Sequence, residues 1–307
     1  MIYTITLSPA LDYLMWLDHF EEGGLNRAGR TAFRAGGKGI NVSVVLTRLG
    51  VPSVCLGYAA GFTGRELIRL LTVEAIRHDF ITVAEGCTRI NVKVKSETET
   101  EINADGPKIE AADLNRLMEK AEKLTADDVL ILSGKPPKSV PDDIYSSLLS
   151  AVSGNNVRTV VDASGSFLYK ALGKNPYLVK PNKAELEEIT GMDLHSNEKI
   201  ASAACFLRDK GARNVLVSLG ADGALLAADD GKVYICGIPE GQLIDSTGAG
   251  DSMTAGFIAH DLSGASKKES LKYAVACGSA SAYSYDLLTA AELGKVFLRT
   301  PEPEIIR

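Results

Sequence analysis

Residues 245–252 read Asp245-Ser246-Thr247-Gly248-Ala249-Gly250-Asp251-Ser252, a glycine-rich loop that leads into a segment with helical spacing. Side chains scarcely screen the backbone N–H groups between Thr247 and Gly250, so these groups can converge on an anion. Unpaired N–H groups and the helix dipole both favour negative charge at a helix N-terminus. The stretch therefore predicts an anion-binding loop at the start of a helix, which we expect over Ser252–His260.

Asp251 stands at the junction of this loop and its helix. A carboxylate beside a bound phosphate would repel it unless the carboxylate served the chemistry. In this position it can accept the proton of an attacking hydroxyl while the loop holds the transferred phosphoryl group. The alternative is an aspartate that caps an ordinary helix after a glycine turn. We favour the phosphoryl-transfer interpretation.

A second glycine loop reads Ala35-Gly36-Gly37-Lys38-Gly39-Ile40-Asn41 and also opens a segment with helical spacing. It is not a Walker A loop, because Lys38 is followed by glycine rather than by serine or threonine. Lys38 and Asn41 suit the recognition of a polyol or a phosphate, one as a point charge and the other as a two-way hydrogen bonder. Taken alone, a plain glycine turn before a surface helix explains this loop equally well.

Composition sets the class of protein. The 307 residues carry a net charge of −6 and scattered lysines and arginines, which argues against nucleic acid as a partner. Five cysteines without a CxxC pair suit a reduced, cytoplasmic protein better than a disulfide framework or a zinc site. No uncharged apolar run reaches the ~18 residues of a membrane helix. No histidine lies near the glycine loops, so a histidine-based triad or metal site is not expected.

Short β-rich runs alternate with helical patterns along the chain. Strands are expected at Ile2–Leu7, Ser53–Gly57, Val129–Ser133, Thr159–Asp162, Tyr177–Lys180 and Val215–Ser218. Helices are expected at Ile40–Leu49, Gly64–Leu71, Ala111–Leu124, Asp142–Val152, Ala184–Thr190, Ser202–Lys210, Lys267–Tyr285 and Thr289–Leu298. This alternation predicts an α/β fold with a mostly parallel sheet covered by helices on both faces. Ligands bind such sheets at the carboxyl ends of the strands.

One segment, Arg89–Ile102, breaks this pattern because apolar and polar residues alternate strictly along it. A period of two is typical of half-exposed strands. Asp12–Asp18 and Gly29–Arg34 could pair with it. We therefore expect a small β-sheet lid from residues 10–35 and 88–105, within a single domain that spans residues 1–307. An enzyme that transfers a phosphoryl group needs such a cover, because water would compete with the acceptor hydroxyl.

Over essentially its whole length, the chain resembles the ribokinase-type carbohydrate kinases of the PfkB family. Both glycine loops match signatures of that family, in the right order and about two hundred residues apart. Four further segments resemble the branch that acts on hexose phosphates: Leu7–Asp12, Asn26–Ala28, Thr88–Lys93 and Thr100–Asn103. The favoured substrate is D-fructose 1-phosphate, phosphorylated at its 6-hydroxyl by ATP. It is implied by the resemblance of three segments to the part of this branch that uses it: residues 10–13, 25–28 and 61–65. Tagatose 6-phosphate remains the alternative.

The resemblance implies a role for each matching residue. Asp251 would be the base, with a pKa kept low by the helix N-terminus, and Gly248, Ala249 and Gly250 would form the anion hole. Residues matching the sugar-phosphate site are Asp12, Gly37, Lys38, Asn41, Arg89, Asn91, Asn103 and Ser133. Residues matching the ATP site are Lys180, Asn182, Ser218, Gly220, Gly223, Thr247, Gly248, Gly250, Cys277 and Ser281. Arg89 suits the phosphate that the sugar already carries, although it could be an ordinary strand-edge arginine. For Cys277 and Ser281, a plain core helix is the alternative.

Asn182 and Glu185 match an Asn-x-x-Glu element that the family associates with Mg²⁺ and phosphate. The same spacing is also a capping box at a helix start, and both interpretations can hold together. The family lid often contributes to dimerisation, so a homodimer through the lid is compatible with the resemblance. No nucleic-acid or membrane partner is implied.

The chain departs from the branch at one loop, where Ser133-Gly134-Lys135-Pro136-Pro137 replaces the usual Ser-Gly-Ser-Leu-Pro. Lys135 adds charge near the expected substrate, so the role of this loop and the choice of substrate stay open. Two other classes of function fit the sequence less well. A sugar-phosphate sensor that has lost catalysis would not need to keep Asp251. A dinucleotide-dependent oxidoreductase would need a glycine fingerprint after the first strand, where Ser8-Pro9-Ala10 stands instead.

Overall fold

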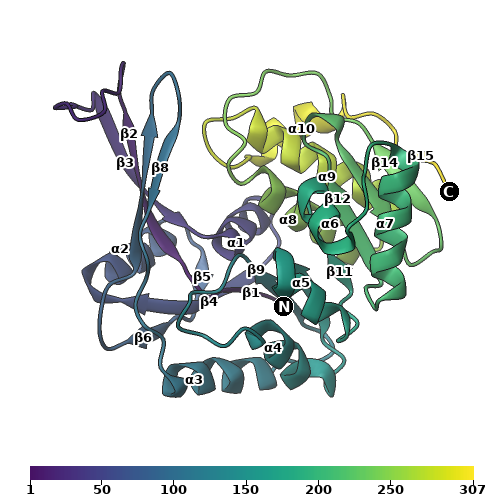
Figure 1. The fold of residues 1–307 in the computed structure, drawn as a ribbon, viewed down its shortest axis with the longest axis horizontal. Coiled ribbons are helices and arrows are strands. Elements are labelled where there is room, and N and C mark those ends of the chain that lie inside the picture. Colours follow the sequence, from purple (N-terminus) through teal and green to yellow (C-terminus); the bar gives the residue numbers. More distant parts are fainter.

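The computed structural model describes all residues from 1 to 307, and its main feature is a large sheet with a parallel centre (Figure 1). The parallel strands lie in the order β11 (Leu178–Val179), β10 (Arg158–Asp162), β9 (Val129–Ser133), β1 (Ile2–Thr6) and β4 (Ser53–Ala60), with β12 (Asn214–Ser218) beside β11. The short strands β5 (Arg77–His78) and β6 (Ile81–Val83) both pair with β4 in parallel. The mostly parallel sheet that was predicted is therefore present.

An antiparallel extension of this sheet was not predicted. It consists of β13 (Ala224–Ala227), β14 (Val233–Cys236) and β15 (Glu304–Ile305), added in that order beyond β12. A 3₁₀ turn over Gly220–Asp222 joins β12 to β13. Gly223 has a φ of 90°, and a Cβ there would lie 2.0 Å from the carbonyl oxygen of Cys236, so only glycine fits this turn.

Helices cover both faces of the sheet, as expected. One face carries α1 (Lys38–Arg48), α8 (Ala249–Leu262), α9 (Lys267–Ala282) and α10 (Ala290–Phe297). The other carries α3 (Ala111–Glu122), α4 (Ile144–Ser153), α5 (Gly165–Leu172), α6 (Lys183–Thr190) and α7 (Asn197–Asp209). Helix α2 (Gly61–Val73) packs near β4 through Leu67 and Leu71. None of these helices is long and apolar enough to cross a membrane.

Helices α8 and α9 pack closely because small residues face each other between them. A Cβ on Gly256 would lie 2.5 Å from the Cys277 sulfur, and one on Gly278 would lie 2.5 Å from Cγ of Met253. Most of the residues of both helices are buried, so neither has a polar face from which its orientation could be read. This tight pair fixes the N-terminus of α8, where the glycine-rich loop ends.

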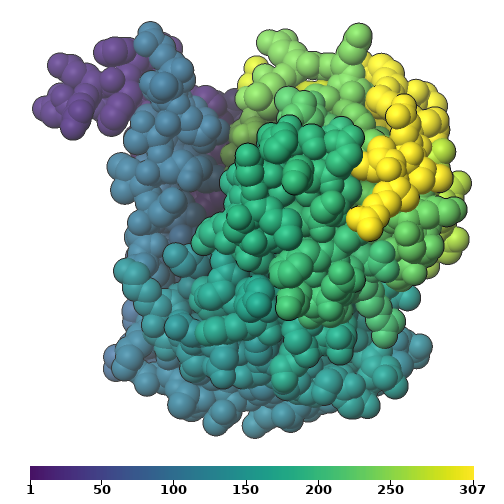
Figure 2. Space-filling view, turned by 45° about the vertical axis from the view of Figure 1, so that its right-hand side comes forward, coloured from purple at the N-terminus to yellow at the C-terminus, as the bar shows by residue number.

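The predicted lid is a separate four-stranded sheet with the order β3 (Arg30–Gly36), β2 (Ala10–Trp16), β7 (Arg89–Lys95) and β8 (Thr100–Asn103). Because successive side chains along each strand point to opposite sides, the two faces of this sheet differ. Asp12, Asn91 and Lys93 line the inner face, while Tyr13 stacks on Phe33 at 4.6 Å between ring centroids on the outer face. Figure 2 shows a hollow between the lid, coloured purple and blue, and the green C-terminal part of the molecule.

Candidate active site

The glycine-rich loop ends at Gly248, whose left-handed φ of 77° turns the chain into α8. The helix begins at Ala249, three residues before the predicted start, so Asp251 lies within its first turn. The N–H groups of Gly248, Gly250 and Asp251 donate to no protein acceptor. These are the orphan donors that bind an anion at a helix N-terminus.

Two of the predicted anion donors are already engaged inside the loop. The N–H of Thr247 donates to Oδ1 of Asp245 at 2.9 Å, and the N–H of Ala249 donates to the carbonyl of Ser246 at 3.2 Å. The prediction that the Ala249 amide belongs to the anion hole is therefore wrong in this structure. The N–H of Asp251 takes its place among the free donors.

The carboxylate of Asp251 is buried, with only 5% of the residue exposed. Its Oδ2 accepts a hydrogen bond from Nδ2 of Asn41 at 2.7 Å, which orients it toward the cavity under the lid. Burial, aided by the negative charge of Asp162, raises the pKa of Asp251 to about 6. The expectation of a low pKa is therefore wrong, because desolvation outweighs the helix dipole and the nearby lysines.

Asp162, at the carboxyl end of β10, is a site residue that sequence reasoning missed. It accepts from Lys180 at 3.1 Å and from Lys38 at 3.3 Å, and the hydroxyl of Thr254 donates to it at 3.2 Å. Burial alone would raise the pKa of Asp162, but the two lysines hold it below its usual value. An aspartate that ends a buried strand of a parallel sheet was the signal in the sequence that could have indicated it.

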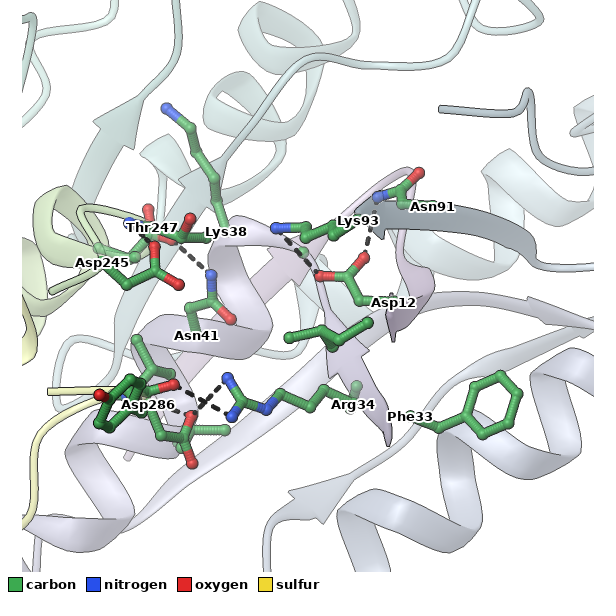
Figure 3. A pocket seen from close by; sticks show the side chains of 18 of the residues that line it. Asp12, Phe33, Arg34, Lys38, Asn41, Asn91, Lys93, Asp245, Thr247 and Asp286 are labelled. Atoms are coloured by element: carbon green, nitrogen blue, oxygen red, sulfur yellow. Dashed lines mark hydrogen bonds and ion pairs between the residues drawn. The ribbon is translucent and has the colours of Figure 1, made fainter. Parts of the chain in front are cut away.

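The space under the lid is a cavity of about 590 Å³, which we call the lid cavity. Seven of the eight predicted sugar-phosphate residues line it, together with Thr247, Gly248 and Asp251: Asp12, Gly37, Lys38, Asn41, Arg89, Asn91 and Asn103. Figure 3 shows Asp12 held between Asn91 (2.9 Å) and Lys93 (3.6 Å). The Oδ1 of Asn91 is buried without a hydrogen-bond partner, so the cavity offers an unused polar atom to a ligand.

Ser133, the eighth residue, lines a neighbouring cavity of about 520 Å³, which we call the loop cavity. The loop from Ser133 to Ser139 forms one of its walls, and residues 104–108, which follow the lid, form another. The two cavities meet at Gly37, Lys38 and Arg89, which line both. Arg89 therefore stands at the boundary between them.

A third cavity of about 430 Å³, the apolar cavity, lies on the other side of the glycine-rich loop. It brings together Asn182, Ser218, Gly220, Gly223, Ala249 and Gly250 with the side chains of Ile238, Leu243, Met253 and Tyr283. Its apolar walls suit a flat heterocycle, and Gly250 brings one of the free amides to this cavity. Sequence reasoning missed the four apolar residues, because they come from separate segments without a shared motif.

Five of the ten residues predicted to bind the nucleotide do not line this cavity. Thr247 and Gly248 line the lid cavity instead, and Lys180 pairs with Asp162. The other two lie in the core. Cys277 is fully buried against Gly256 in the core, and the hydroxyl of Ser281 bonds that of Ser252 at 2.7 Å. Helix α9 instead presents Val275, Gly278, Ser279 and Ala282 to the cavity. The prediction named the wrong face of α9.

Asn182 and Glu185 form a reciprocal capping box at the start of α6. The N–H of Glu185 donates to Asn182 Oδ1 and the N–H of Asn182 donates to Glu185 Oε2, both at 2.8 Å. The chain has no group of three or more acidic, histidine or cysteine side chains that could hold a metal by itself. One carboxylate oxygen of Glu185 is not used by the cap, so the pair fits only a hydrated cation that substrate phosphates also hold.

A polar cavity and an apolar cavity thus meet at a set of free amides, and a buried carboxylate faces the polar one. This geometry defines an enzyme that moves a phosphoryl group between two bound molecules, a small-molecule kinase. The pfkB family carbohydrate kinase model matches residues 6–291, and the chain belongs to that family. The predicted ribokinase-like fold is confirmed.

Named relatives match almost the full length of the chain. It is 42% identical to the 1-phosphofructokinase of Bacillus subtilis over 94% of this chain and 95% of the relative. It is 36% identical to the D-tagatose-1-phosphate kinase of Bacillus licheniformis over 95% and 96%. The structure of phosphofructokinase-2 from Escherichia coli in complex with fructose-6-phosphate superposes with a TM-score of 0.91 at 30% identity, covering 97% and 98% of the two chains.

Proposed function

We propose that the chain, as one kinase domain over residues 1–307, transfers the γ-phosphoryl group of ATP to the 6-hydroxyl of D-fructose 1-phosphate. One observation carries this proposal: Asp251 faces the lid cavity from the same helical turn whose free amides adjoin the apolar cavity. A sugar in the lid cavity and a nucleotide in the apolar cavity would meet at this turn. The products would be fructose 1,6-bisphosphate and ADP.

In the reaction, the 6-hydroxyl oxygen attacks the γ-phosphorus as its proton passes to Asp251. The new O–P bond forms while the bond between the γ-phosphorus and the bridging oxygen breaks, and ADP leaves with that oxygen. The free amides of Gly248, Gly250 and Asp251 would stabilise the charge on the phosphoryl oxygens. Lys38, held by Asp162, adds positive charge on the sugar side. The raised pKa makes Asp251 a better proton acceptor than an exposed aspartate.

Asn182 and Glu185 would hold hydrated Mg²⁺ through the unused oxygen of the Glu185 carboxylate. A bound Mg²⁺ neutralises phosphate charge during transfer. The capping box keeps this carboxylate at the first turn of α6, beside the apolar cavity that Asn182 lines. The cap and the cation role are therefore compatible.

Fructose 1-phosphate is favoured by the name of the relative that is 42% identical and by the cationic boundary at Arg89. The test is ADP formation with fructose 1-phosphate, tagatose 1-phosphate, tagatose 6-phosphate, fructose 6-phosphate and fructose. We expect the highest kcat/KM with fructose 1-phosphate. A higher value for tagatose 1-phosphate would instead assign the activity named for the relative that is 36% identical. Binding without any ADP formation would point to a sensor.

We also propose that the outer face of the lid forms a homodimer. Phe33 and Ile102 are 48% and 59% exposed there, beside Tyr13. Phe33→Asp should convert a dimer into a monomer in light scattering, while Phe62→Asp, at an exposed position on α2, should not.

The five free cysteines and the cellular supply of ATP favour a cytoplasmic location.

A further inference from the structure

The loop cavity differs from the lid cavity in its charge. Six acidic and six basic side chains line the lid cavity. Five basic side chains line the loop cavity (Lys38, Arg89, Lys108, Lys135 and Lys138) against a single acid, Asp105. In a chain with a net charge of −6, such a concentration of positive charge requires an explanation. The loop cavity is therefore a compartment for the anionic part of a ligand.

Most of these basic groups already have carboxylate partners. Lys38 pairs with Asp162, Lys108 with Glu110 at 2.8 Å, and Lys138 with Asp105 at 3.8 Å. Two cations have none. Lys135 makes no hydrogen bond or ion pair, and Arg89 donates only to the carbonyl of Ser8 at 3.3 Å.

Two hydroxyl groups on the wall of this cavity also lack partners. Ser133 is 2% exposed and Thr6 is 3% exposed, and neither side-chain oxygen has a hydrogen-bond partner. Buried hydroxyls are normally bonded. A free ammonium, a free guanidinium and two unused hydroxyls together match the several acceptor oxygens of a phosphate group.

The loop that carries Lys135 is held at both ends. The N–H of Gly134 donates to the carbonyl of Asp162 at 2.9 Å, and the buried Tyr145 donates its hydroxyl to the Gly134 carbonyl at 2.8 Å. At the far end, the Ser139 hydroxyl accepts from the Ile109 N–H at 3.1 Å. Pro136 and Pro137 restrict the backbone between these anchors. The exposed Lys135 therefore extends from a stiff loop, which lowers the backbone part of the entropy cost of binding a ligand.

We propose that Lys135, together with Arg89, binds the phosphate that the sugar substrate already carries and so sets the preference for a sugar phosphate over the free sugar. This inference rests on the proposed function, since it takes a sugar phosphate as the substrate. The sugar crosses the Gly37–Lys38 boundary, its acceptor hydroxyl lies in the lid cavity near Asp251, and its phosphate lies in the loop cavity. The departure at position 135 from the family pattern is thus a specificity feature of this chain.

The test compares Lys135→Met with Lys138→Met, which removes the same charge from the same loop at a residue that is paired with Asp105. Steady-state kinetics should show that Lys135→Met raises KM for fructose 1-phosphate by about tenfold or more, the effect of losing one charge-assisted hydrogen bond. KM for ATP and turnover of free fructose should change less than about twofold. Lys138→Met should behave like the wild type, and Lys135→Arg should restore most of the affinity.

Titration calorimetry with fructose 1-phosphate supplies a readout that does not depend on turnover, and it should show the same loss of affinity only in Lys135→Met. An unchanged KM and affinity in Lys135→Met would overturn the inference while the kinase proposal stands. An equal rise in KM for Lys138→Met would also overturn it, because the loss of any positive charge from this loop would then have the same effect. If the wild-type protein phosphorylates no sugar phosphate, the proposed function fails and this inference fails with it.

Discussion

The ammonium of Lys95, on lid strand β7, lies 2.9 Å from Oδ2 of Asp245 at the start of the glycine-rich loop. The other oxygen of the same carboxylate accepts a hydrogen bond from the N–H of Thr247. The lid is therefore tied to the loop that holds the free amides. Both side chains of the pair are about one-sixth exposed (17% and 16%), so solvent screens the interaction only partly. Arg34 makes a second tie from the lid to Asp286 at 3.4 Å.

Lys95→Met should loosen the lid. Water would then reach the transferred phosphoryl group more often, because the lid excludes it. We expect the ratio of ATP hydrolysis to sugar phosphorylation to rise roughly fivefold, as for the loss of about 1 kcal/mol from a partly buried pair. ADP release measured with and without fructose 1-phosphate gives this ratio. Lys199→Met, an exposed change on α7, is the control, and an unchanged ratio in Lys95→Met would show that the tie has no part in closure.

Asp251→Asn should remove the proton acceptor while keeping the shape of the site. The asparagine can still accept the hydrogen bond from Asn41, so the fold and nucleotide binding should persist. We expect kcat to fall by roughly 10²-fold or more. Turnover near the wild-type value, with ATP binding confirmed by titration, would mean that the Asp251 carboxylate only holds Asn41 and is not the proton acceptor.

The same substitution should stabilise the protein at neutral pH. The pKa of Asp251 is about 6 in the folded state because of burial, above its ordinary value of 3.8, so the ionised carboxylate is disfavoured there. A raised folded-state pKa means that stability falls as pH rises from about 4 to 6. Asp251→Asn should therefore raise the free energy of unfolding by on the order of 3 kcal/mol at pH 7, since each pKa unit corresponds to about 1.4 kcal/mol.

Urea unfolding at pH 7 and at pH 4 measures this effect. The difference between Asp251→Asn and the wild type should be much smaller at pH 4, where the folded-state carboxyl of Asp251 is protonated and its unfolded-state counterpart only partly ionised. Asp209→Asn, at the C-terminal end of α7, controls for the loss of a surface carboxylate. A destabilised Asp251→Asn at pH 7 would contradict the assignment of burial as the dominant cause.

Arg89→Ala should weaken the binding of the sugar phosphate and leave ATP nearly unaffected. Arg89 lines the two cavities on the sugar side and is absent from the apolar cavity. We expect KM for fructose 1-phosphate to rise by roughly tenfold to a hundredfold, with KM for ATP within about twofold. Arg89→Lys should recover part of the loss, since it keeps the charge without the fork. Equal rises in both KM values would indicate a structural role at the strand edge.

Glu185→Gln separates the capping role from the cation role. Glutamine at this position keeps the capping box but loses the charge. The Mg²⁺ concentration for half-maximal rate should therefore rise several-fold, while the melting temperature and KM for the sugar phosphate stay nearly unchanged. A Mg²⁺ titration identical to that of the wild type would leave Glu185 with the cap alone.

Local patterns predicted the elements well where the pattern was strong. Strand β9 has the predicted ends, and the alternation along Arg89–Ile102 correctly indicated a half-exposed sheet. The orientation of α9 could not be predicted in the same way. Its small and apolar residues occur on every side, because the helix is buried almost all round, so Cys277 and Val275 were equal candidates for the cavity wall. Only packing against Gly256 on α8 settles which of the two faces the core.

The sequence by itself determined the α/β fold, the lid, the two glycine loops and the family, because each is indicated by local patterns, even where the segments that carry them are far apart along the chain. The tertiary structure alone decided the electrostatics of the site. The pKa of Asp251, on α8, is set by its burial and by two residues from other elements, Asn41 on α1 and Asp162 on β10. Desolvation and charge interactions depend on distance in space, which no local pattern records.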